Sequence, residues 1–209
     1  MDWNNNPLES LEPIKVARRV LRDYFTGSTG HQGLYRWRGE FWFWDGEQWK
    51  ILREDEIRER VLLILEDAVW EQVTVNGPVI RRYAPDKHKI EGVVGALEAL
   101  CRLDKEEVPC WIIPQTDVID PAHCVAFKDY IIDVKGSTVD DWATRERDQR
   151  WFDTSVVPHN ADMNAECPRW MQALDEWGDG DPEWGRLLQR WFGYCLMGTR
   201  KYAKWLLMY

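Results

Sequence analysis

The stretch that decides the fold spans residues 34–52 and reads LYRWRGEFWFWDGEQWKIL. Two turns that contain glycine, Arg38-Gly39 and Asp45-Gly46, divide it into three short segments. This is the pattern of an antiparallel meander with tight connections. Each segment carries Trp, Tyr or Phe, residues that favour strands. We therefore expect a small aromatic sheet here.

Helical spacing of apolar residues surrounds this meander. The periodicity predicts helices over Pro13–Phe25, Glu54–Trp70, about His88–Leu103 and Pro168–Trp177, and another helix that starts with Asp181 as its cap and Pro182 in its first turn. Arg81-Arg82-Tyr83 is interpreted as a basic turn and Asp140–Pro158 as an irregular connection.

The middle of the chain predicts a second, shorter β-hairpin, formed by Cys124–Phe127 and Tyr130–Val134. Together these patterns predict an α+β fold, mainly α, in which helices pack with a small aromatic antiparallel meander and a short second hairpin. We expect two parts. Residues 1–104 form a helical subdomain with the meander, and residues 105–209 form the hairpin and a helical subdomain.

Composition narrows the function classes. A net charge of −9 argues against a protein that coats nucleic acid non-specifically, so any DNA contact must come from a local basic patch. Five Cys without a Cys-x-x-Cys pair indicate reduced thiols. The first residues carry no signal-peptide pattern, and no stretch is long and apolar enough to span a bilayer. We expect a soluble, cytoplasmic protein.

Motifs for catalysis or metal binding are weak. The segment Gly193–Gly198 has the glycine spacing of a nucleotide-binding loop, but Thr199 and Arg200 stand where Lys and a hydroxyl residue are needed. The acidic loop 175–181 lacks the ligand spacing of an EF-hand and fits helix capping. His and Cys residues could form a zinc site only by long-range folding. We expect no metal site and no catalytic residue in this chain.

One basic helical face stands out beside the aromatic meander. The cations and rings concerned are Lys15, Arg18, Arg19 and Arg22 on the helix and Arg36, Arg38, Trp42 and Trp44 in the meander. Interleaved basic and aromatic residues suit single-stranded DNA, because cations follow phosphates and rings stack on bases. The same rings also suit the core of a small sheet, so both interpretations stay open.

Several motifs in the second half occur in a characteristic order. They are Phe152-Asp153-Thr154 with Val157-Pro158, Cys167-Pro168-Arg169-Trp170, the run 188–196 (LQRWFGYCL) and Lys204–Tyr209 (KWLLMY). This order resembles the segment that precedes the helicase motor in phage, plasmid and poxvirus-type primase–helicases. The run 125–134 is similar to the strand pair of that family, with Lys128-Asp129 where Asn-Gly is usual.

The resemblance implies an accessory or collar domain for DNA replication, which links a primase or polymerase to a hexameric superfamily-three ATPase. The apolar run 205–209 would be the first strand of that motor, so the chain would be a piece of a longer protein. ATP and Mg²⁺ would bind elsewhere in the parent, which would be the ATP-dependent enzyme, and this piece would need no cofactor. The implied partner is DNA, single-stranded in our expectation, with no membrane.

The candidate DNA contacts are Lys15, Arg18, Arg19, Arg22, Arg36, Arg38, Arg81, Arg82, Arg200, Lys201 and Lys204, with Trp42 and Trp44 as candidate stacking residues. Two alternatives remain. Asp129, Asp133 and Asp153 are carboxylates of the kind that a metal-dependent nuclease or nucleotidyl transferase gathers around Mg²⁺. The 14 Trp are equally compatible with a protein-interaction module that does not bind DNA.

Overall fold

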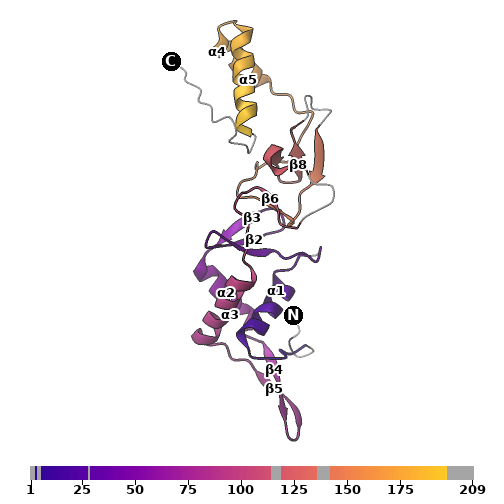
Figure 1. The fold of residues 1–209 in the computed structure, drawn as a ribbon, viewed down its shortest axis with the longest axis vertical. Coiled ribbons are helices and arrows are strands. Elements are labelled where there is room, and N and C mark those ends of the chain that lie inside the picture. Colours follow the sequence, from indigo (N-terminus) through magenta and orange to yellow (C-terminus); the bar gives the residue numbers. More distant parts are fainter. Residues whose placement is uncertain (1–2, 4–5, 28, 114–118, 136–141, 197–209) are drawn as a thin grey trace. The chain divides into compact units, whose positions relative to one another are not determined.

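The computed structural model describes residues 3, 6–27, 29–113, 119–135 and 142–196, and it divides into two compact units, residues 1–106 and 107–209. Both units combine helices with small antiparallel sheets, which confirms the predicted α+β class (Figure 1). Within the described ranges, none of the helices combines the length and the apolar character needed to cross a bilayer.

The first unit is built from three helices, a meander and a hairpin. In chain order its elements are α1 (Pro13–Tyr24), β1 (Leu34–Trp37), β2 (Glu40–Trp44), β3 (Trp49–Leu52), α2 (Glu54–Leu65), β4 (Val69–Thr74), β5 (Gly77–Arg82) and α3 (Lys87–Leu100).

The core of this unit lies where the three helices meet. Val16 and Val20 of α1, Ile57 of α2, and Val93 and Leu97 of α3 are completely buried in one cluster. The spacing of four residues within α1 and within α3 places each pair on one helix face, so the helices bury these faces against each other. Each such side chain contributes roughly 1.5–3 kcal/mol by leaving water.

The meander β1-β2-β3 is antiparallel and has both predicted turns. Arg38 and Gly39 have φ values of 51° and 87°, as a tight hairpin turn with two left-handed residues requires. One face of the sheet joins the helical core through Leu34, Phe41 and Leu52. The residues on the other face form an aromatic layer, whose members are Tyr35, Trp37, Trp42, Trp44 and Trp49.

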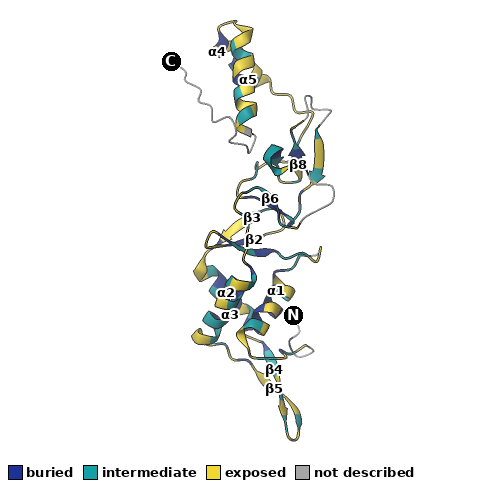
Figure 2. Ribbon diagram, viewed as in Figure 1, coloured by how far each residue is buried: buried dark blue, intermediate teal, exposed yellow. Residues whose placement is uncertain are grey.

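The prediction that α2 continues to Trp70 is wrong. The helix ends at Leu65, and Val69–Thr74 forms β4, which pairs with β5 in a ribbon that projects from the helices and is mostly exposed (Figures 1 and 2). Polar and apolar residues alternate only over 72–75, and this short stretch precedes Asn76-Gly77, a strong turn signal for a hairpin. Arg81 and Arg82 therefore end a strand and do not form a turn.

The second unit contains short strands followed by two helices. Its elements are β6 (Cys110–Trp111), η1 (Pro121–His123), β7 (Cys124–Ala126), β8 (Tyr130–Asp133), β9 (Ala143–Glu146), β10 (Trp151–Phe152), α4 (Pro168–Gly178) and α5 (Pro182–Leu196).

The predicted hairpin of this unit is confirmed as β7-β8, but β9 extends it to three strands. The expectation of an irregular connection over Asp140–Pro158 is thus wrong for its described residues, since β10 also pairs there with β6. Trp111 and Trp151 meet edge to face at 4.9 Å in the core of this unit. These strands are too short for their alternation to stand out in the sequence.

The helices α4 and α5 form a hairpin closed by a polar turn. Asp179 adopts φ 46° and ends α4, and the carboxylate of Asp181 accepts a hydrogen bond from the backbone N–H of Glu183 at 2.9 Å. Trp170 packs edge to face on Phe192 at 5.1 Å. The expected strand over residues 205–209 lies outside the described residues.

Two glycines of α3 offer a matched test of helix packing. A Cβ on Gly92 would lie 3.2 Å from Cγ of Pro13, whereas a Cβ on Gly95 would meet nothing within 4 Å. Gly95→Ala should therefore raise the free energy of unfolding by about 0.5–1 kcal/mol, because Ala favours the helix. Gly92→Ala should raise it less or lower it. Urea unfolding of both variants measures the difference, and equal gains would contradict close packing of α3 on Pro13.

Candidate nucleic-acid interface

The exposed face of α1 carries three of the candidate cations. Burial of Val16 and Val20 turns Lys15, Arg18 and Arg22 to the outside of the unit. These three side chains line a groove of about 280 Å³, together with Arg19 and with Glu9 and Ser10 of the preceding segment. The helical spacing of three and four residues thus collects positive charge along one side of the helix.

Arg19 has a different role from its neighbours. It is only 8% exposed, it forms an ion pair with Asp23, and its Nη1 donates to the side-chain oxygen of Asn6 at 3.1 Å. Its guanidinium also lies 5.7 Å from the ring centre of Trp3. The interpretation of Arg19 as an exposed DNA contact is therefore corrected, because its charge holds the amino-terminal segment against α1.

Acidic neighbours reduce the positive charge of two of the remaining cations. Lys15 Nζ lies 3.2 Å from Glu12, and Arg22 Nε donates to Asp23 at 2.9 Å, a hydrogen bond that raises the pKa of Arg22. Arg18 has no ion-pair or hydrogen-bond partner among the described residues. Exposed pairs of this kind are weak and exchange readily, so all three side chains can turn to a phosphate.

A second basic groove, of about 620 Å³, lies at the β1–β2 turn. Arg36 and Arg38 line it as candidates from the sequence, and Arg102 and Lys105 join them from the segment after α3. That segment is brought there because the backbone of Arg36 exchanges hydrogen bonds with Cys101 at 2.7 Å and Leu103 at 2.9 Å. The sequence carried no signal for Arg102 and Lys105, since the pairing is long-range.

The cations of this second groove are partly neutralised. Arg36 pairs with Glu98 at 2.6 Å, and Arg102 pairs with Asp104 at 2.7 Å. Arg38 lies flat on the ring of Trp37, with its guanidinium carbon 4.4 Å from the ring centre. A guanidinium held over an indole in this way keeps its charge and its outward donors.

The two candidate stacking residues differ in access. Trp42 is 7% exposed and packs edge to face on Trp37 at 6.2 Å, so a base could reach its ring only by displacing neighbouring side chains. Trp44 is half-buried and tilted against Trp49 at 5.6 Å. The aromatic layer thus serves packing first, and Trp44 is the more accessible of the two rings.

The remaining candidates are not gathered with these grooves. Arg81 and Arg82 lie at the base of the β4–β5 ribbon, where Arg81 Nε donates to Gln72 and Arg82 Nη2 donates to the carbonyl of Glu66 at 3.2 Å. Arg200, Lys201 and Lys204 lie outside the described residues.

Comparisons with known proteins add no family to this geometry. No family model and no curated protein matches the chain. The residues of this chain alone therefore indicate its function.

The three carboxylates of the nuclease alternative are each engaged in the backbone or in an ion pair. Asp129 accepts from the N–H of Ala161 at 2.8 Å, and Asp133 accepts from the N–H of Lys135 at 2.9 Å. Asp153 is buried against Arg147, with 2.7 Å between carboxylate and guanidinium. Over the described ranges, no three His, Cys, Asp or Glu side chains group closely enough to hold a metal ion.

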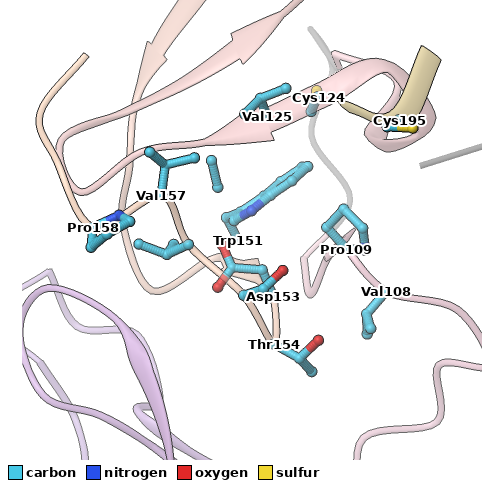
Figure 3. A pocket seen from close by; sticks show the side chains of 13 residues that line it. Val108, Pro109, Cys124, Val125, Trp151, Asp153, Thr154, Val157, Pro158 and Cys195 are labelled. Atoms are coloured by element: carbon cyan, nitrogen blue, oxygen red, sulfur yellow. The ribbon is translucent and has the colours of Figure 1, made fainter. Parts of the chain in front are cut away.

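Asp153 also borders the cavity shown in Figure 3, of about 500 Å³. Burial raises the pKa of its carboxyl above the ordinary value, while Arg147 opposes the rise. Cys124 lines the same cavity, and burial raises the pKa of its thiol to about 12. A thiol protonated at neutral pH is a poor nucleophile, so Cys124 is not activated in this cavity.

The Arg147–Asp153 ion pair allows a test of whether Asp153 stabilises the fold. Asp153→Ala leaves the guanidinium of Arg147 buried without its carboxylate and should lower the free energy of unfolding by about 3–5 kcal/mol. Asp175→Ala on the exposed side of α4 is the control and should change it by less than about 0.5 kcal/mol. Chemical denaturation measures both. A variant at Asp153 as stable as the control would remove the structural role.

Proposed function

We propose that this chain is an accessory domain of a DNA-replication primase–helicase and that the α1 face contacts DNA phosphates. The observation that carries the DNA contact is the groove lined by Lys15, Arg18 and Arg22 in a chain whose net charge is −9. The ordered motifs of the second half support the primase–helicase context. In that context the domain acts in the cytoplasm, of the host cell if the parent is encoded by a phage.

The dimensions of the α1 face fit a run of phosphates. Lys15 and Arg22 are seven residues apart, so the helical rise of 1.5 Å per residue separates them by about 10 Å along the axis. Phosphates of one strand repeat every 3.4 Å along the axis of B-DNA and lie farther apart in an extended single strand, so about 10 Å covers roughly two to three of them. Three mobile cations along this length match that charge spacing.

The chemistry of the parent is expected elsewhere. The proposal gives this domain no ATP-hydrolysing or priming residue, and it makes the domain part of a hexameric collar that guides DNA toward the motor. Acidic side chains beside two of the three cations, Glu12 beside Lys15 and Asp23 beside Arg22, keep the intrinsic affinity low. Affinity then rises when several copies bind one strand together, as expected for linked binding sites.

A protein-interaction module is the second candidate, and one observation favours it. The α4–α5 hairpin exposes large apolar side chains, namely Met171, Trp177, Leu187 and Phe192. Exposed aromatic and Met residues are enriched at interfaces. Protein interaction through α4–α5 and DNA contact through α1 are compatible in one chain, because the two sets of side chains lie in different units.

Removal of the exposed α1 cations tests the DNA contact. The triple variant Lys15→Ala, Arg18→Ala, Arg22→Ala should bind single-stranded DNA more weakly. The slope of log affinity against log salt concentration should also be shallower by up to about two, because each lost phosphate contact removes about 0.7 from that slope. Fluorescence anisotropy across a salt series measures both quantities.

Arg186→Ala supplies the control, because Arg186 is an exposed arginine of α5 that pairs with Glu183. It should leave affinity and slope unchanged. If wild-type protein binds no single-stranded DNA at low salt, the DNA contact is wrong and the interaction module is favoured. Cleavage or extension of labelled DNA in the presence of Mg²⁺ or Mn²⁺ would instead support the nuclease or transferase alternative.

The parent sequence gives an independent test of the replication context. If the resemblance to primase–helicases holds, the parent gene also encodes a Gly-x-x-x-x-Gly-Lys-Ser/Thr loop downstream of residue 209. Sequencing the parent gene past this point decides the matter. A parent that continues there without this loop would contradict the assignment to a helicase motor.

A further inference from the structure

The β4–β5 ribbon is the most exposed element of the first unit. It projects from the three helices, and Figure 2 shows it largely in the colour of exposed residues. Val73 is 85% exposed and Val75 is fully exposed, while Ile80 is half exposed. No residue from Gln72 to Ile80 carries a charge, although 30% of the chain is charged. An apolar, uncharged tip held out in water requires an explanation.

The ribbon is firmly anchored at its base. The N–H of Leu8 donates to Val69 at 2.7 Å, and the N–H of Glu71 donates back to Leu8 at 3.3 Å, so the amino-terminal segment pairs with β4. On the other strand, Tyr83 is buried and its N–H donates to Ala68 at 2.8 Å. The tip therefore extends from a fixed base.

Charge and apolar character are separated along the ribbon. Residues that pair directly share a face, so Val73, Pro78 and Ile80 lie on one face. Arg82 belongs to the same face nearer the base, and Arg81 belongs to the opposite face. Glu71 pairs with Ile80 and shares the face of Arg82. The ribbon thus has a cation on each face at its base, a carboxylate level with Ile80, and an uncharged tip beyond that carboxylate.

These features favour nucleic acid over a protein partner. The two strands and their turn comprise 14 residues from Val69 to Arg82, fewer than the roughly 20–30 per side of a stable protein interface. A two-stranded ribbon fits the major groove of duplex DNA. Cations on both faces of the base suit the phosphates on both sides of a groove, and apolar side chains can wedge between base steps.

The uncharged tip is also long enough to reach the bases at the floor of a DNA groove. Asn76 is four residue steps from Gln72, which at about 3.3 Å per step extends about 13 Å. The grooves of B-DNA are about 7.5–8.5 Å deep. The apolar side chains can therefore reach the base edges while the arginines remain at the phosphates.

We propose that the β4–β5 ribbon enters a groove of duplex DNA, with Arg81 and Arg82 at the phosphates and Val73, Val75 and Ile80 against the bases. This proposal rests on the DNA contact proposed above and adds a duplex-binding element to it. The α1 face then follows the backbone of a single strand, while the ribbon marks the adjoining duplex.

A duplex with 2-aminopurine at one step tests the insertion, because this base becomes more fluorescent when it is unstacked. Wild-type chain should raise the fluorescence on binding. The tip variant Val73→Ser, Val75→Ser, Ile80→Ser should lose this rise and bind the duplex at least about fivefold more weakly, as expected when apolar side chains no longer leave water on binding. Leu63→Ser, at an exposed apolar site on α2, is the matched control and should behave as wild type.

The base variant Arg81→Ala, Arg82→Ala separates phosphate contact from insertion. It should make the salt dependence of duplex binding shallower by about two, at about 0.9 per phosphate. Circular dichroism and urea unfolding confirm that each variant is folded. Because the substituted side chains are exposed, the midpoints should stay close to that of wild type.

The outcomes distinguish this proposal from the one on which it rests. If the tip variant retains the full fluorescence rise while the α1 triple variant loses single-strand binding, the ribbon proposal is overturned and the proposed function stands. If the tip variant instead converts an oligomer into monomers in sedimentation without changing the fluorescence, the ribbon binds a second copy and the DNA assignment is wrong. If wild-type chain binds neither DNA form, both proposals fail.

Discussion

The packing of α1 against α3 is the contact on which the first unit depends. Burial of Val16 and Val20 against Val93 and Leu97 fixes the rotation of α1, and this rotation determines which charged side chains reach the solvent. Gly92 allows the two helices to approach closely, because its missing Cβ leaves space for Pro13. The buried face of α1 thus also fixes the position of the basic groove, because the side chains on the opposite face of the same helix must point away from the core.

The two neighbouring arginines of α1 show how sharply this rotation matters. Arg18 and Arg19 are adjacent in sequence, yet one is exposed and the other is buried in an ion pair with Asp23. Successive helical residues differ by about 100° around the axis, and Arg19 falls at the edge of the buried face. There its charge is matched by Asp23 and Asn6, as a buried guanidinium requires. A count of basic residues cannot separate these roles.

The arrangement of charge explains how an acidic chain could still contact DNA. The candidate cations among the described residues lie on one helix face, in one groove and at the base of one ribbon, and acidic side chains partly neutralise those of the helix face and the groove. Such local patches support contact at defined places without general coating of nucleic acid. The two kinds of element, a helix face for a backbone and a ribbon for a groove, suit a domain that meets single and double strands together.

The sequence by itself determined the α+β class, the meander with its turns at Gly39 and Gly46, and the positions of most helices. These follow from turn chemistry and periodicity, which act over a few residues. Asn76-Gly77 is also a local turn signal. The helical spacing of apolar residues before it continues to Trp70, however, and therefore predicts a helix where β4 begins. Apolar runs of this length fit either period.

Only the tertiary structure decided which candidates share a site. It joined Arg102 and Lys105 to Arg36, buried Arg19 and Trp42, and set Asp153 against Arg147. Each of these outcomes depends on residues brought together by long-range pairing or by packing. Spacing along the chain carries no information on such contacts, because burial and ion pairing depend on what the fold places opposite each side chain.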